Sequence, residues 1–365
     1  MLRVPRAQVL AYRIHAQQLD RDGGVLDDTA VLDMGVQDTG PDGGLWALAV
    51  RGVDVSTPPL DALATVWTIR GAPHLYRRAD LPAVTAAVEP FSDADAGKRI
   101  FDASKPLKAA GIANIAALDA VADAMRRVVT EPMGKGAVSA RVTELMDPPY
   151  LRFCRPCNAT HLYEMPFRLA ALRAGLELRA GTSPPVLEPI PGFEQAGTAP
   201  QRLDVIRAYL RLLGPATPKH VAAYLDAPVK DVRDRWPSDA VEVDVDGEQR
   251  WILDADAGAL DAAAAHVTRL LGPFDLFLQG RDRDLLVADR GRAKSLWPVL
   301  GRPGGVLVDG EVAGTWRPRK SGRRLRVDVE LWGTASRPSM RAIGREAARL
   351  AAYRKIAFGG VDYAG

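Results

Sequence analysis

An α+β fold is predicted for this chain of 365 residues from three features of its sequence. Helical stripes of apolar residues alternate with hairpin signals along most of the chain. Two Asp-Gly pairs, Asp246-Gly247 and Asp309-Gly310, each stand between runs that suit strands, the pattern of a two-residue hairpin turn. The C-terminal part is rich in strand signals. At about 150 residues per domain, the length predicts two or three domains.

The clearest unit lies between Leu203 and Leu253. Apolar residues form a helical stripe over 203–213, and Gly214-Pro215 ends it. A second helix is expected from Thr217, where a capping residue precedes a proline, and a third over 229–236. The first Asp-Gly hairpin, 241–253, follows. Three helices and a two-stranded wing in this order predict a winged-helix module.

Two weaker copies of this pattern precede it. In the first, a helix is expected over 9–19 and a strand–turn–strand wing over 67–77. In the second, helical patterns cover 116–129, 135–146 and 161–174, and a strand begins at Leu176. The stretch 182–192 is too proline-rich for a regular element and is interpreted as a linker. The predicted division is winged-helix modules at 1–92, 93–192 and 200–256, then a β-rich domain at 257–365 with a terminal helix.

The C-terminal region carries an excess of positive charge. Residues 273–365 contain 18 Lys and Arg against 10 Asp and Glu, although the whole chain carries only +3. Six basic residues and no acid lie between Arg317 and Arg326, next to strand patterns over 305–316 and 325–331. Such a hairpin can neutralise phosphates and bind nucleic acid without sequence preference, and a solvated basic turn is the alternative.

Composition excludes several classes of protein. The chain has no apolar run long enough to cross a membrane and no secretory leader, and its two cysteines suit a reducing compartment, so we expect a cytoplasmic protein. No Walker loop, Rossmann glycine fingerprint or Ser-His-Asp arrangement is recognisable, so nucleotide-dependent chemistry is not expected.

Several stretches resemble the winged-helix DNA-binding family that contains the AlkZ and YcaQ DNA glycosylases. These stretches are 35–37, Thr68–Leu75, Leu271–Leu278 and Val308–Trp316. The resemblance spans nearly the whole chain. It implies three tandem winged helices followed by a small β-barrel, a face that holds DNA, and excision of alkylated bases, including bulky adducts of genotoxic natural products.

The same resemblance points to a short catalytic motif. Family members carry Gln-aliphatic-Gln or Gln-aliphatic-Asp at the position where this chain has Gln37-Asp38-Thr39. A cationic alkylated purine leaves readily, so amides that hold a water on the sugar suffice. We expect Gln37 and Thr39 to orient that water and Asp38 to act as base or to stabilise a cationic sugar. In a strand Asp38 would point away from the other two, so only a turn lets all three converge.

An ordinary surface loop is the alternative for this motif, in which Asp38 or Thr39 merely caps the helix expected near 45–50. The pair Gln17-Gln18 is interpreted as a solvated face of the first helix. Asp275 is expected at a strand entrance, where it orders the barrel or holds an arginine such as Arg281.

Two further groups of residues have alternative interpretations. Cys154 and Cys157, with His161, have a spacing that zinc tolerates, but a closed structural site needs a fourth ligand, so two packed or free thiols are the default. His74 either contacts DNA phosphate or the lesion pocket, or is satisfied within its hairpin.

The leading hypothesis is a monofunctional DNA glycosylase that hydrolyses the bond to an alkylated or bulky-adducted purine. Its expected partner is duplex DNA, and no membrane is involved. We expect a monomer that needs no metal, organic or nucleotide cofactor. A non-catalytic DNA-binding protein, such as a regulator or adduct binder, is the second hypothesis, and a scaffold for protein contacts is the third. The residues expected to contact DNA are Arg70, His74, Arg317, Arg319, Lys320, Arg323 and Arg324.

Overall fold

The computed structural model describes residues 2–56 and 60–364. The chain forms two compact units. Unit 1 comprises Met1–Pro58, Tyr209–His220 and Pro237–Gly365, and unit 2 comprises Pro59–Ala208 and Val221–Trp236. Both units mix helices with mainly antiparallel strands, so the predicted α+β class is confirmed.

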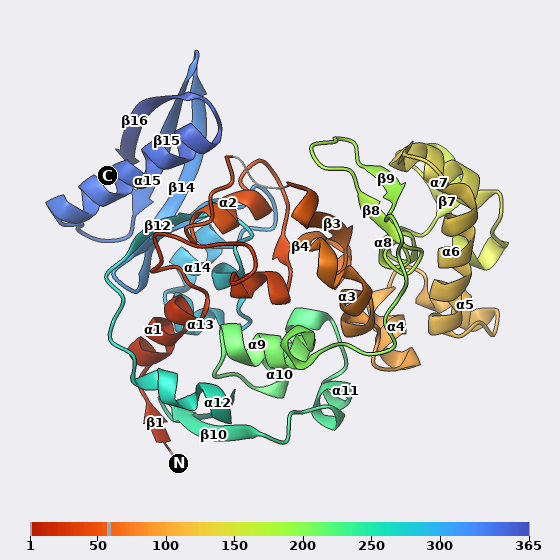
Figure 1. The fold of residues 1–365 in the computed structure, drawn as a ribbon, viewed down its shortest axis with the longest axis horizontal. Coiled ribbons are helices and arrows are strands. Elements are labelled where there is room, and N and C mark those ends of the chain that lie inside the picture. The colour runs from red at the N-terminus through yellow and green to blue at the C-terminus, as the bar shows by residue number, and fades with distance from the viewer. Residues whose placement is uncertain (1, 57–59, 365) are drawn as a thin grey trace. The chain divides into compact units, whose positions relative to one another are not determined.

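Unit 1 contains two sheets and the helices around them (Figure 1). Its elements are β1 (Leu2–Val4), α1 (Arg6–Ala16), β2 (Val36–Gln37), α2 (Gly44–Ala49), β10 (Ala240–Val245), β11 (Glu248–Leu253), α12 (Asp254–Ala257), β12 (Thr268–Leu271), α13 (Arg283–Leu286), α14 (Arg290–Leu296), β13 (Gly304–Val308), β14 (Glu311–Ser321), β15 (Arg324–Leu331), α15 (Arg337–Tyr353) and β16 (Ala357–Ala364).

The C-terminal sheet of unit 1 is an open meander with one added strand. Its order is β12-β13-β14-β15-β16, in which β16 runs parallel to β15 and the other neighbours are antiparallel. Since β12 and β16 are its two edges within the described residues, the sheet is the meander of the sequence prediction and not a closed barrel. The terminal helix is confirmed as α15, whose buried Ile343, Ala347 and Leu350 recur at helical spacing. The strand β16 was not predicted.

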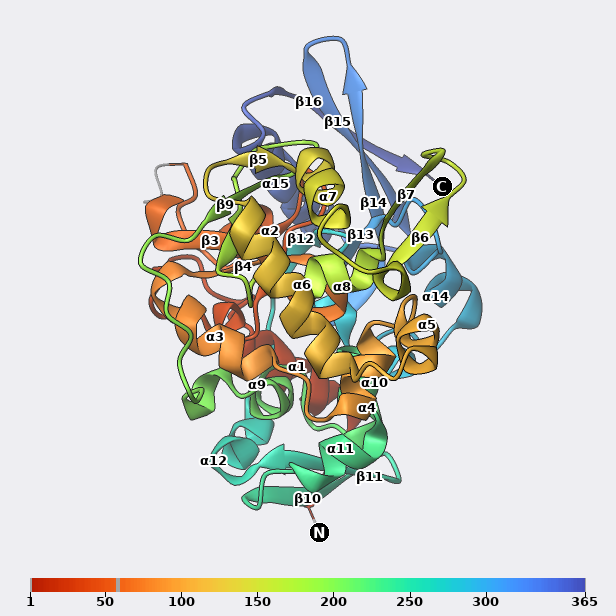
Figure 2. The same ribbon diagram turned by 90° about the vertical axis from the view of Figure 1, so that its right-hand side faces the viewer.

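The smaller sheet of unit 1 has the order β1-β10-β11. The N-terminal strand β1 pairs in parallel with β10, and Figure 2 shows the N-terminus beside β10. Asp246 and Gly247 both have positive φ (50° and 91°), as do Asp309 and Gly310 (48° and 91°), so both Asp-Gly turns form as predicted.

Unit 2 is built around the helix α6 (Asn114–Val128), which buries one of its faces. Leu118, Val121, Ala122 and Met125 recur on one face of α6 and are at most 2% exposed. Helices α4, α5, α7 and α8 contact α6, and Figure 2 shows α7 and α8 beside it. The described elements of this unit are β3 (Leu63–Trp67), β4 (Pro73–Arg77), α3 (Leu81–Val88), α4 (Asp93–Arg99), α5 (Ser104–Ala109), β5 (Met133–Gly134), α7 (Lys135–Thr143), β6 (Leu151–Cys154), β7 (Ala159–Leu162), α8 (Glu164–Leu169), β8 (Leu176–Leu178), β9 (Val186–Pro189) and α11 (Val229–Asp234).

Two sequence interpretations in unit 2 are wrong. The stretch 182–192 is not a linker, because it contains β9, which pairs with both β8 and β5 and buries Leu187 completely. Its prolines flank Leu187 and leave that residue's amide free for the sheet. The helical pattern over 161–174 is mostly not helix: His161 and Leu162 belong to β7, and α8 covers only Glu164–Leu169.

The helix–helix–helix–hairpin order predicted for 203–253 is present. It consists of α9 (Val205–Leu213), α10 (Pro218–Leu225) and α11, followed by β10 and β11. The helices α9 and α10 each contain residues of both units. The assignment of this segment to a winged helix, and the division into four segments at 1–92, 93–192, 200–256 and 257–365, remain predictions.

Candidate functional site

Gln37 is the last residue of β2, and its side-chain amide is held at both ends. Its Nε2 donates to Thr39 Oγ1 at 3.1 Å. Its Oε1 accepts a hydrogen bond of 2.8 Å from Nε2 of Gln279, which also donates to the Phe274 carbonyl at 2.9 Å. These bonds fix the orientation of the Gln37 amide, with its oxygen toward Gln279.

Asp38 points to a different group. Its Oδ1 accepts a hydrogen bond of 2.8 Å from the backbone N–H of Gly44, the first residue of α2. A Cβ at Gly43 would lie 2.6 Å from this oxygen, so the close approach requires glycine. Burial raises the pKa of Asp38, and the Gly44 N–H partly opposes this rise. Asp38 therefore makes a hydrogen bond to the start of α2, as the capping alternative expects, while Gln37 and Thr39 bond to each other. The catalytic role of each of the three residues stays a prediction.

A buried ion pair joins Arg51, which follows α2, to Asp275. Arg51 donates to both carboxylate oxygens of Asp275, at 2.7 and 2.9 Å, and both side chains are fully buried. Arg51 also donates to the Gln17 backbone and side-chain oxygens and to the Ala47 carbonyl. Asp275 thus holds Arg51, from a distant part of the chain, and not Arg281 as expected.

The interpretation of Gln17-Gln18 as a solvated helix face is wrong. The helix α1 ends at Ala16, and the Gln17 side chain is fully buried and donates to the Leu212 carbonyl at 2.9 Å. Gln18 has a positive φ of 58° and accepts a hydrogen bond from the Ala30 amide. The Gln17 amide therefore belongs to the interior of unit 1, whereas Gln18 lies beyond the end of α1 with a half-buried side chain that also donates to the Asp28 carbonyl.

The comparisons with known proteins identify the family. A model of the family described as DNA glycosylase AlkZ-like matches residues 33–353, which is most of the chain. The chain belongs to the AlkZ-like DNA glycosylase family. The structure of Streptomyces sahachiroi DNA glycosylase AlkZ has the same fold, with a TM-score of 0.75, 20% sequence identity and 100% of both chains covered. No curated protein matches the sequence.

Membership of the AlkZ-like family confirms the resemblance inferred from the sequence, but the site residues of this chain remain predictions. Gln279 was missed at the sequence level, although it directly follows the stretch Leu271–Leu278 that carries the resemblance. Nothing in the spacing connects it with Gln37, since 242 positions separate the two residues. Only the folded chain brings these two amides together.

Arg70 and His74, expected to contact DNA, lie in the β3–β4 hairpin of unit 2. The His74 ring is fully buried, and its Nδ1 lies 3.0 Å from Thr68 Oγ1 and 2.9 Å from the Ala72 carbonyl. Burial and, to a smaller extent, the positive charge of Arg70 lower the pKa of His74 to about 3. A buried, neutral imidazole of this kind is poorly placed for a phosphate contact, but its hairpin satisfies only Nδ1, because Nε2 is buried without a hydrogen-bond partner among the described residues. A contact between His74 and DNA stays a prediction.

Arg70 is also engaged within unit 2. It has a positive φ of 58°, donates to the Tyr224 carbonyl at 2.7 Å, and places its guanidinium 4.7 Å from the centre of the Tyr224 ring. Arg70 also lines a pocket together with Trp67 and Thr68. Arg70 is therefore bound to Tyr224 within unit 2, and its contact with DNA stays a prediction.

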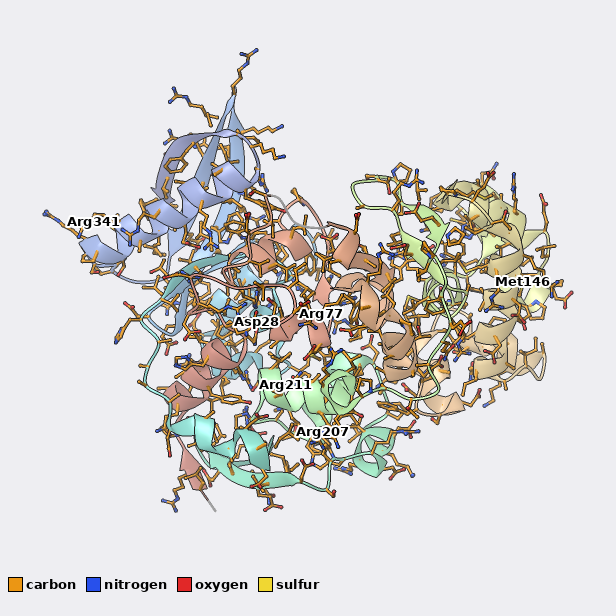
Figure 3. All side chains as sticks on the ribbon, in the orientation of Figure 1. Asp28, Arg77, Met146, Arg207, Arg211 and Arg341 are labelled. Atoms are coloured by element: carbon orange, nitrogen blue, oxygen red, sulfur yellow. The ribbon has the colours of Figure 1, made fainter. Side chains whose placement is uncertain are left out.

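The basic run forms the β14–β15 hairpin, as predicted. Nitrogen-tipped side chains surround the end of this hairpin in Figure 3. Arg319 and Arg326 are both paired with Asp362 of β16, and Arg319 also with Asp328. By contrast, Arg317, Lys320, Arg323 and Arg324 are exposed and have no carboxylate of the described residues within 4.0 Å.

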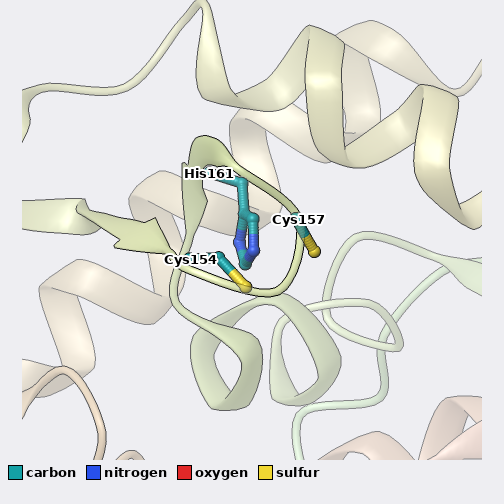
Figure 4. A group of neighbouring side chains, drawn as sticks. All are labelled: Cys154, Cys157 and His161. Atoms are coloured by element: carbon teal, nitrogen blue, oxygen red, sulfur yellow. The ribbon is translucent and has the colours of Figure 1, made fainter.

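One group of potential metal ligands occurs among the described residues, on the β6–β7 hairpin of unit 2. Cys154, Cys157 and His161 lie together at its turn (Figure 4). A hydrogen bond between Cys154 and His161, and one with the Cys157 amide, lower the pKa of the Cys154 thiol to about 7, and Cys154 in turn raises the pKa of Cys157.

None of the helices in the described part of the chain combines the length and apolar character needed to cross a bilayer.

Proposed function

We propose that this protein is a monofunctional DNA glycosylase that hydrolyses the N-glycosidic bond of alkylated or bulky-adducted purines, in base excision repair or in protection against a genotoxin. Membership of the AlkZ-like family supports the reaction class. The single observation that carries the site is the Gln37 amide, held between Thr39 and Gln279. An amide fixed in this way is a suitable group for orienting a water molecule.

The proposed chemistry needs no strong base. An N7-alkylated purine carries a positive charge, so the electron pair of the breaking bond neutralises the leaving base. The carbonyl oxygen of Gln37 has two lone pairs, of which Gln279 uses one, and the second accepts a hydrogen bond from the attacking water. The water oxygen adds to the sugar carbon, one of its hydrogens stays on the new hydroxyl group, and the other is released to solvent as a proton. Thr39 contributes by fixing the amide of Gln37.

DNA binding is proposed to use the exposed cations of the basic hairpin, with the winged-helix segments contributing further contacts. Four exposed cations of that hairpin have no carboxylate partner among the residues that the structure describes: Arg317, Lys320, Arg323 and Arg324. Cations in this setting neutralise phosphates, release counterions and give affinity without sequence preference. Arg319 and Arg326 are already neutralised by Asp362 and are assigned a supporting role.

The test is base release from duplex DNA that carries 7-methylguanine or, separately, a bulky N7-guanine adduct, followed by alkaline cleavage at abasic sites. Wild type is expected to cleave at least one substrate. Gln37→Ala is expected to reduce release by about a hundredfold or more while DNA affinity is kept. Gln195→Ala, an exposed glutamine of unit 2, is the matched control and is expected to act like wild type.

A non-catalytic DNA-binding protein is the second candidate, and one observation favours it. Asp38 accepts a hydrogen bond from the start of α2, and Thr39 is hydrogen-bonded to Gln37. The motif therefore has fewer polar groups left to bind a water molecule than three converging side chains would have. This candidate predicts salt-dependent binding without release of either base, and no effect of Gln37→Ala. Those results together would replace the glycosylase proposal.

A further inference from the structure

The β6–β7 hairpin of unit 2 carries three side chains that the proposed glycosylase chemistry does not use. Cys154 ends β6, Cys157 lies in the four-residue turn, and His161 lies on β7 opposite Arg152. Figure 4 shows the two sulfur atoms and the imidazole gathered at the turn. The spacing is Cys-x₂-Cys-x₃-His within one hairpin, so all three groups come from a single local element.

The distances among these groups suit a small soft cation. One ligand atom from each residue can be chosen such that all three lie within 4.8 Å of one another. Zinc–sulfur bonds of about 2.3 Å and zinc–nitrogen bonds of about 2.0 Å place tetrahedral ligands roughly 3.5–4 Å apart. Side-chain rotations at an exposed turn are sufficient to close the remaining gap.

The imidazole of His161 is already oriented as a ligand. Its Nδ1 lies 2.8 Å from the carbonyl oxygen of Leu162, so Nδ1 carries the proton and donates it to this oxygen. This tautomer leaves the lone pair of Nε2 for another partner. Histidine ligands of metals are commonly fixed in this way by a backbone carbonyl on the other ring nitrogen.

The backbone of the turn brings the two sulfur atoms together. Asn158 follows Cys157 with a positive φ of 48°, a conformation that asparagine tolerates well, and its amide donates to the Arg155 carbonyl at 3.2 Å. The Cys157 amide is also hydrogen-bonded to the Cys154 side chain. A tight turn with an amide directed at the first sulfur holds both thiols on the same side of the hairpin.

The hairpin has little else to stabilise its outer end. Within the described residues β6 and β7 pair only with each other, and an isolated two-stranded hairpin is marginal in water. Phe153 is 61% exposed and Cys157 is exposed, whereas Leu162 is buried at the base. A metal cross-link between the turn and β7 would supply the missing constraint.

We propose that Cys154, Cys157 and His161 bind one zinc ion, whose fourth position is taken by water. The donor set of two thiolates and one imidazole selects zinc over magnesium or calcium, which prefer oxygen ligands. The role assigned to the metal is to order the hairpin. This inference concerns a different part of the chain from Gln37 and does not depend on the glycosylase proposal.

The experiment measures zinc in the full-length, untagged protein after reduction with a phosphine, incubation with zinc and exhaustive dialysis. Wild type is expected to retain about one zinc per chain, and Cys157→Ala and His161→Gln less than about a tenth of that. His266→Gln is the matched control, because His266 is an exposed histidine of unit 1. Circular dichroism of each variant checks that the fold is kept.

Cobalt provides a second readout of the same ligands. Titration of the reduced protein with Co²⁺ is expected to give thiolate-to-metal charge-transfer absorption and tetrahedral ligand-field bands, both lost in Cys157→Ala. Thiol reactivity is expected to fall when zinc is added. Reduced wild type that retains no zinc, shows no cobalt–thiolate band and keeps two reactive thiols would overturn the proposal, as would equal loss of zinc in His266→Gln.

Discussion

The loop around Gln37 and the tip of the β14–β15 hairpin use polar side chains in opposite ways. Beyond α2, which follows this loop, the pair of Arg51 and Asp275 is completely buried, and each charge is neutralised by the other. At the hairpin tip, Arg323 and Arg324 are exposed, and the described part of the chain offers neither of them a carboxylate partner. Buried polar groups must find partners within the protein, so they fix geometry, whereas exposed cations remain available to an external polyanion. We therefore expect the loop to hold its side chains in a fixed geometry, and the hairpin to supply an affinity for DNA that is easily changed.

The largest effect is expected from breaking the buried pair. Asp275→Asn leaves the Arg51 guanidinium buried without a counter-charge, and we expect a loss of about 3–5 kcal/mol in the free energy of unfolding. Urea unfolding measures this loss. Asp362→Asn removes an acid of the surface group at β14–β16 and is expected to cost much less. Equal losses in the two variants would mean that burial does not distinguish the regions.

The next effect concerns the positioning of Gln37. Gln279→Met keeps the side-chain volume but removes the donor to Gln37 Oε1, and base release is expected to fall by about tenfold to a hundredfold. If Gln279 acts through Gln37, the double variant with Gln37→Ala is no slower than Gln37→Ala alone. Multiplied losses in the double variant would show that Gln279 acts by another route.

At the hairpin, the expected effect is on affinity. Arg323→Ala together with Arg324→Ala is expected to reduce the slope of log affinity against log salt by up to about 0.9 for each phosphate that the protein no longer neutralises. Base release at saturating protein stays unchanged. Arg341→Ala with Arg345→Ala removes the same charge from the exposed face of α15, where Figure 3 labels Arg341, and is the control. A larger change of slope in the control would assign DNA binding to α15.

The smallest effect is expected at Asp38. Because burial raises its pKa in the folded protein, protonation favours folding, so wild type gains stability as the pH falls through the raised pKa and lacks this gain at neutral pH. Asp38→Asn keeps an acceptor for the Gly44 amide without the buried charge, and is expected to be at least as stable as wild type at pH 7 with a flatter pH profile. Retained base release would assign Asp38 to capping, and abolished release would make it the base.

The patterns that depend on neighbouring residues could be predicted from the sequence. Both Asp-Gly turns form, and α9, α10 and α11 precede β10 and β11 as expected, because periodicity, capping and turn chemistry act over a few positions. The motifs of the AlkZ-like family were also visible. Predictions from local patterns were wrong where pairing with a distant segment determines the structure. The strand β9 forms in a proline-rich stretch because β8 and β5 pair with it.

The sequence by itself determined the α+β class, the family and the position of Gln37 in its motif. Only the tertiary structure decided that Gln279 holds the Gln37 amide, that Asp275 pairs with Arg51, and that Gln17 is buried. The physical reason is the cost of leaving a buried polar group unpaired. That cost is met by whichever partner the folded chain brings within reach, over separations of more than two hundred residues that no local pattern encodes.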